Sequence, residues 1–128
     1  MHPALLLSWI AHPRVTPWWR AALALLLIVI TWLALSPAPP QQFDLGWDKL
    51  NHVAAFATLA VVALWGRCGS LWRVGGALLA YGGLIEVLQS YTPNRVGEWP
   101  DLLADGVGIA LGLVLGQRSL QCAACASS

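Results

Sequence analysis

The chain has 128 residues, of which 58% are hydrophobic and only 10% are charged, and its formal net charge is +1. Since about 25% of an ordinary soluble domain is charged, this composition argues against a water-soluble globular protein. The small net charge excludes a basic nucleic-acid surface, and three scattered cysteines exclude a disulfide framework.

Four apolar stretches predict an all-α polytopic membrane protein. Each is close to the ~20 residues that a helix needs to cross ~30 Å of hydrocarbon. The four expected transmembrane helices cover residues 18–36, 47–66, 71–91 and 99–116. Residues 1–17 are expected to be a cytoplasmic segment, either an interfacial helix or a loose end, and residues 117–128 a cytoplasmic tail.

The connections between the apolar stretches agree with this division. Prolines at 37, 39 and 40 end the first stretch, a short polar turn covers 67–70, and Thr92-Pro93 ends the third. Tryptophans at the ends of the stretches mark the headgroup layers. An alternative for the first helix is a cleaved signal peptide that ends near residues 34–36.

Orientation follows from the basic residues. With four spans both termini lie on one side, which carries most of the arginines: Arg14, Arg20, Arg67, Arg73 and Arg118. The opposite side carries Lys49 and Arg95. The positive-inside rule therefore predicts cytoplasmic termini, with loops 36–47 and 91–100 facing outward.

Polar residues gather at one depth, just under the predicted outer surface. They lie at the start of the second helix, at the end of the third, in the loop that follows it and at the start of the fourth. In chain order they are Asp48, Lys49, His52, Glu86, Gln89, Arg95, Asp101 and Asp105. A charge that faces lipid costs several kcal/mol, so such groups normally face the bundle interior. We therefore expect a shared polar cleft that is open to the outside and binds a ligand.

Several of these residues also have purely structural explanations. Asp48 and Asp101 lie in first helical turns, where a carboxylate caps free N–H groups and meets the positive end of the helix dipole. Lys49 is typical of a lysine that extends toward the interface, and His52 of a hydrogen-bonded interior histidine.

Glu86 and Asp105 are harder to explain in this way. Glu86 approaches a helix C-terminus, where the dipole disfavours a negative charge, and Asp105 lies too deep for an ordinary cap. Arg95, Lys49 and His52 are the candidate partners of Glu86. A metal ion held by His52, Glu86 and Asp105 is an open possibility, although no spacing here matches a specific metal motif and no cofactor is expected.

Gly108, Gly112 and Gly116 form a ridge of small residues on the fourth helix. Such a ridge lets a neighbouring helix approach closely. The neighbour is either another helix of the same chain or the same helix of a second copy in a homodimer.

Four sequence blocks, in order, resemble the signature of the VanZ-like family. They are DKLNHVAAF at 48–56, YGGLIEVLQ at 81–89, PNR at 93–95 and DLLADGVG at 101–108. Asp105 departs from the pattern, which usually has Asn there. The resemblance implies a multi-pass protein of the bacterial inner membrane and cell envelope. It also implies a context of glycopeptide resistance, because the family is named after a member associated with low-level teicoplanin resistance.

Two functions fit these residues best, and no catalytic residue is assigned. A transporter or proton-coupled channel is a third alternative and would need an oligomer, because the titratable groups lie at one end only. In the first, Arg95 with Lys49 or His52 holds an anionic group of a membrane lipid, a lipid-linked cell-wall precursor or a lipoglycopeptide, as an accessory to resistance. Glu86, Asp101 and Asp105 would then orient Arg95. The alternative is an intramembrane hydrolase or transferase, with or without a metal ion, that acts on a lipid-linked envelope precursor.

Overall fold

The computed structural model describes residues 8–10, 12–38 and 46–126. Within these ranges the chain is helical and has no strand, which confirms the all-α prediction. A short 3-10 helix, η1 (Pro13–Val15), leads into the first of four long helices. These are α2 (Thr16–Leu35), α3 (Asp48–Trp65), α4 (Leu71–Ser90) and α5 (Trp99–Ala126).

The last helix is longer than the sequence predicted. It continues to Ala126 instead of ending near residue 116, so the described part of the expected tail is helical. No proline or further glycine follows Gly116 to stop the helix. The added turns also pack, since Ala123 is buried and the indole N–H of Trp65 donates to Ser119 Oγ over 2.8 Å.

Three segments of the described chain are long and apolar enough to cross a membrane: Pro13–Leu35, Leu71–Ser90 and Trp99–Cys125. The expected fourth span, α3, is not among them. The beginning of α3 carries Asp48, Lys49, Asn51 and His52, and these side chains lower the hydropathy of a helix that is otherwise apolar.

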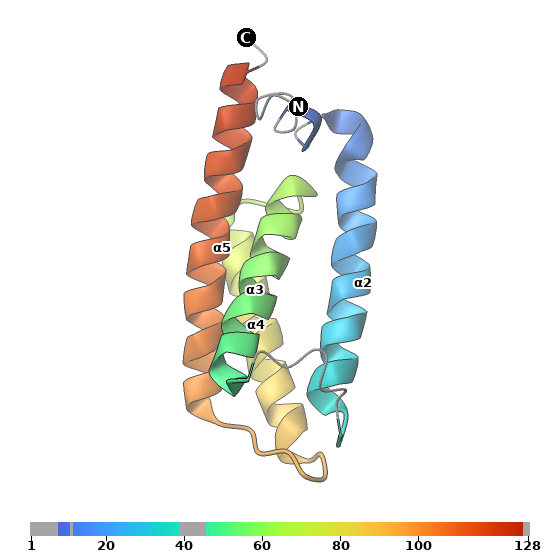
Figure 1. The fold of residues 1–128 in the computed structure, drawn as a ribbon, viewed down its shortest axis with the longest axis vertical. Coiled ribbons are helices and arrows are strands. Elements are labelled where there is room, and N and C mark those ends of the chain that lie inside the picture. The colour runs from blue at the N-terminus through green and yellow to red at the C-terminus, as the bar shows by residue number, and fades with distance from the viewer. Residues whose placement is uncertain (1–7, 11, 39–45, 127–128) are drawn as a thin grey trace.

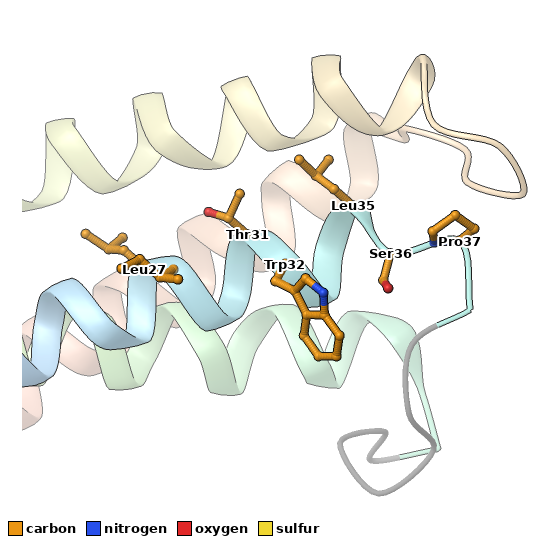
Figure 2. Close-up of a pocket in the computed structure, with 7 residues that line it drawn as sticks. Leu27, Thr31, Trp32, Leu35, Ser36 and Pro37 are labelled. Atoms are coloured by element: carbon orange, nitrogen blue, oxygen red, sulfur yellow. The ribbon is translucent and has the colours of Figure 1, made fainter.

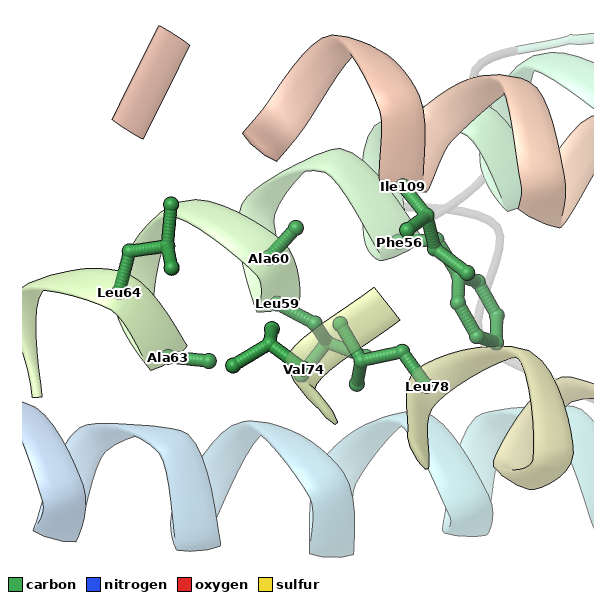
Figure 3. Close-up of a cluster of buried hydrophobic side chains, with 8 residues drawn as sticks. All are labelled: Phe56, Leu59, Ala60, Ala63, Leu64, Val74, Leu78 and Ile109. Atoms are coloured by element: carbon green, nitrogen blue, oxygen red, sulfur yellow. The ribbon is translucent and has the colours of Figure 1, made fainter. Parts of the chain in front are cut away.

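The hydrophobic core is built around α3. Phe56, Leu59, Ala60, Ala63 and Leu64 of this helix pack with residues of α4 and α5, as Figure 3 shows. By contrast, α2 has no buried residue and contributes only partly buried side chains. Helix α3 is therefore the central element, and much of the apolar surface of α2, α4 and α5 is left on the outside of the bundle.

The glycine ridge of α5 is used within the chain. A β-carbon at Gly108 would lie 2.5 Å from the carbonyl oxygen of Val53, and one at Gly112 would overlap the carbonyl of Ala57. Close approach of α3 to α5 thus depends on these glycines. The ridge therefore contacts another helix of the same chain, and the homodimer through it stays a prediction.

The helices alternate in direction, and this places their ends in two groups (Figure 1). The start of α2 and the end of α5 lie at one end of the bundle. The end of α2, the start of α3, the end of α4 and the start of α5 lie at the other. This second group carries the polar residues that the sequence singled out, and we call it the polar end.

Candidate functional site

Side chains from three helices meet at the polar end. Nδ1 of His52 on α3 lies at hydrogen-bond distance, 2.7 Å, from Oδ1 of Asp105 on α5. The same nitrogen lies 4.0 Å from Oε1 of Glu86 on α4. The side chain of Asp105 is completely buried, and those of His52 and Glu86 are each 11% exposed. We call these three residues the inner group.

Both carboxylates of the inner group have an unsatisfied oxygen. Oε2 of Glu86 accepts a hydrogen bond from the backbone N–H of Glu98 over 2.9 Å, which ties the α4–α5 loop to α4. Within the described residues, however, Oε1 of Glu86 and Oδ2 of Asp105 are buried without a hydrogen-bond partner. Buried polar atoms are nearly always satisfied, so these two oxygens point to something further at this place.

Lys49 and Asp101 form an outer pair that lies closer to the surface. Nζ of Lys49 lies 3.2 Å from Oδ1 of Asp101 and 3.8 Å from Oε2 of Glu98. The other oxygen of Asp101, Oδ2, lies 3.9 Å from Nε2 of His52. Asp101 therefore lies between the partly exposed ammonium of Lys49 and the more deeply placed imidazole of His52.

Arg95 and Gln89 both reach across to the end of α2. Arg95 donates from Nε to the carbonyl of Ser36 over 3.1 Å and from Nη2 to the carbonyl of Leu33 over 2.9 Å. Gln89 donates from Nε2 to the carbonyl of Ala34 over 3.0 Å. Leu33 and Ala34 belong to the last turn of α2 and Ser36 is its C-cap residue, so these carbonyls lack the usual partner within the helix. Arg95 is thus oriented by α2 and not by Glu86, Asp101 and Asp105.

Two contributors are not among the predicted site residues. Glu98 forms the second contact of Lys49, and Gly82 leaves the space that the carboxylate of Asp105 fills. A signal for each was present, because Gly82 lies one helical turn before Glu86 and Glu98 lies one turn before Asp101. That Gly82 faces Asp105 depends on how α4 is rotated relative to α5, and the sequence alone does not determine this rotation.

The outer pair borders a polar pocket with a volume of about 380 Å³. Its lining residues are Trp47, Asp48, Lys49, Gln89, Asn94, Arg95, Val96, Glu98 and Asp101. A second pocket, of about 630 Å³, runs along the apolar side of α2 from Leu27 to Pro37 (Figure 2). The two pockets are adjacent, since Ser36 lines the apolar one and accepts a hydrogen bond from Arg95, which lines the polar one.

Carboxylates outnumber cations at this site. Asp48, Glu86, Glu98, Asp101 and Asp105 stand against Lys49 and Arg95, with His52 between them. Chemically, such an arrangement can hold a cation, and the His52–Asp105 pair has the geometry of an imidazole that a carboxylate orients for proton transfer.

Comparison with known proteins agrees with this picture. The model of the VanZ/LLP1 family matches residues 5–119. The chain belongs to the VanZ/LLP1 family. This confirms the resemblance seen in the four sequence blocks and, together with its long apolar helices, makes the chain a VanZ-like membrane protein. No curated protein and no solved structure matches it.

Proposed function

We propose that all four long helices span the bacterial inner membrane, with the polar end facing outward. The central position of α3 supports a fourth span, because His52 near its start meets Glu86 of α4 and Asp105 of α5 rather than lipid. The basic residues support the orientation. Arginines lie at the end opposite to the site, whereas the polar end has only Lys49 and Arg95 among the described basic residues.

We further propose that the polar pocket binds the anionic group of an envelope lipid, a lipid-linked precursor or a lipoglycopeptide, as an accessory to glycopeptide resistance. The observation that carries this proposal is that Lys49 and Arg95 line one pocket at the expected membrane surface. Both cations already have partners within the chain, since Lys49 pairs with Asp101 and Glu98 and Arg95 donates to the carbonyls of Leu33 and Ser36. An anionic group would add to these contacts, and the side chain of Lys49, which is 35% exposed, can be reached from the surface.

The adjacent apolar pocket supports a lipid ligand. An acyl chain lying along Leu27, Thr31 and Leu35 would reach Ser36 and Pro37 at the polar end (Figure 2). Its headgroup would then lie beside Arg95 and Lys49. A lipid thus satisfies both pockets, an apolar one for its tail and a polar one for its charge.

Native mass spectrometry of the purified chain in mild detergent tests this function. Phosphatidylglycerol and teicoplanin are offered separately as anionic probes, with phosphatidylcholine as the neutral comparison. We expect retention of an anionic probe over phosphatidylcholine, a clear loss in Lys49→Gln, and no change in Arg73→Gln, which removes a charge at the opposite end. Equal retention of all three probes, or an unaffected Lys49→Gln, would contradict the proposal.

The second candidate is a hydrolase or transferase acting on a lipid-linked envelope precursor. The specific observation in its favour is the 2.7 Å contact between His52 and Asp105, which suits a general base next to the pocket. Incubation of the purified chain with a lipid-linked precursor should then give a product that His52→Gln does not form. If the precursor is retained but never converted, the binding function stands alone.

A further inference from the structure

The inner group has the composition of a metal site. An imidazole nitrogen and two carboxylates are ligands that Zn²⁺ and Mn²⁺ accept. One candidate ligand atom from each of His52, Glu86 and Asp105 lies within 4.8 Å of the other two. The three residues come from three different helices, so their convergence is a product of the tertiary fold.

The two distances from His52 lie on either side of the spacing around a single ion. Nδ1 of His52 lies 2.7 Å from one carboxylate oxygen and 4.0 Å from the other. These values bracket the roughly 3.4 Å that separates neighbouring ligands of a tetrahedral ion with bonds of about 2.1 Å. Small side-chain shifts would therefore bring all three atoms to bonding distance.

The unsatisfied oxygens supply an independent reason to expect a ligand. Oδ2 of Asp105 belongs to a completely buried side chain, and Oε1 of Glu86 is buried as well. Neither has a hydrogen-bond partner among the described residues. A bound cation would satisfy both carboxylates and would offset the excess of negative charge in this part of the bundle.

Asp101 lies beside His52 on the side away from Glu86 and Asp105, where it would not bind the ion itself. A histidine that binds a metal through one ring nitrogen usually directs the N–H of the other to a carboxylate. Nε2 of His52 faces Oδ2 of Asp101 at 3.9 Å, and Lys49 holds the other oxygen of Asp101. An ion bound at Nδ1 would place the remaining ring proton at Nε2, on the side that faces Asp101.

Asp48, His52 and Asp101 form a competing group whose ligand atoms are equally close. It is less suitable, because Asp48 is exposed and Asp101 already pairs with Lys49, whose ammonium would repel a cation.

We propose that His52, Glu86 and Asp105 bind one divalent transition-metal ion through Nδ1 and one oxygen of each carboxylate. This site goes beyond the proposed headgroup binding. Three protein ligands leave a coordination position for water or an anionic oxygen.

Titration of the full chain with Mn²⁺ in detergent, followed by electron paramagnetic resonance and by competition with Zn²⁺, tests this site. We expect one ion per chain. In Glu86→Gln and in Asp105→Asn the affinity for Mn²⁺ should fall about tenfold or more. The matched control Glu98→Gln should bind like the unmodified chain, and so should Asp48→Asn.

Absence of stoichiometric binding by the folded chain would overturn the site. So would a loss in Asp48→Asn with none in Glu86→Gln, which would assign the ion to the competing group. Because no lipid is present in the titration, its failure leaves the retention test with Lys49→Gln intact.

Discussion

Gly82 on α4 faces Asp105 on α5 so closely that a β-carbon at position 82 would lie 2.5 Å from Oδ2. We predict that Gly82→Ala displaces the carboxylate of Asp105 from His52, destabilises the fold by about 1–3 kcal/mol through overpacking, and weakens Mn²⁺ binding. Gly83→Ala is the matched control, since its added methyl group would meet nothing within 4 Å. Thermal unfolding in detergent and Mn²⁺ titration measure both effects, and equal behaviour of the two variants would contradict this packing.

The glycine ridge gives a second prediction. Gly112→Ala should destabilise the chain by about 1–3 kcal/mol, because the methyl group would overlap the carbonyl of Ala57 and push α3 from α5. Gly76→Ala, which meets nothing within 4 Å, should be neutral or stabilising. Unfolding in detergent measures the difference. The mass of the protein in detergent should be the same for both variants. If Gly112→Ala alone dissociated a dimer, the ridge would instead join two copies of the chain.

Arg95 should act mainly on α2. In Arg95→Gln the carbonyls of Leu33 and Ser36 lose their donors, and two hydrogen bonds from a charged group are worth about 1.5–3 kcal/mol each. We expect amide hydrogen exchange in the last turn of α2 and the residues after it to become about tenfold faster or more. Arg73→Gln, at the opposite end of the bundle, is the control and should leave this exchange unchanged. Unaltered exchange in Arg95→Gln would show that α2 is held by other contacts.

Labelling of single cysteines tests the topology. Proteins with one cysteine at Trp47→Cys or Asn94→Cys should react with an impermeant maleimide from outside the inner membrane. Proteins that keep only Cys68 or only Cys122 should react after permeabilisation. If Cys68 were labelled from the outside, α3 would not span the membrane. If Cys122 were labelled from the outside and Asn94→Cys were not, the orientation of the bundle would be the reverse of the one proposed.

Much of this architecture could be predicted because apolar length and helix breakers are local properties. The helices begin at Thr16, Asp48, Leu71 and Trp99, where the sequence indicated starts at 18, 47, 71 and 99. The end of α5 was missed because Gly116 resembles a helix end in the sequence, whereas in the fold it packs against Leu64 of α3.

The depth of the site residues was predictable, but their pairing was not. Spacing along each helix places His52, Glu86 and Asp105 near one end of the bundle. Which cation meets which carboxylate depends on the rotation of each helix about its axis, and no local pattern determines this. Arg95 shows the difference, since the sequence assigned it to the carboxylates and the fold assigns it to α2.

The meeting of His52 and Asp105 inside one bundle is tested most directly by solid-state nuclear magnetic resonance in lipid bilayers. With ¹⁵N-labelled histidine and ¹³C-labelled aspartate, a hydrogen bond of 2.7 Å predicts strong dipolar dephasing of His52 Nδ1 by a carboxyl carbon. This dephasing should disappear in Asp105→Asn and persist in Asp48→Asn. If His52 shows no coupling, or keeps it without Asp105, then the side chains of α3 and α5 do not form the inner group.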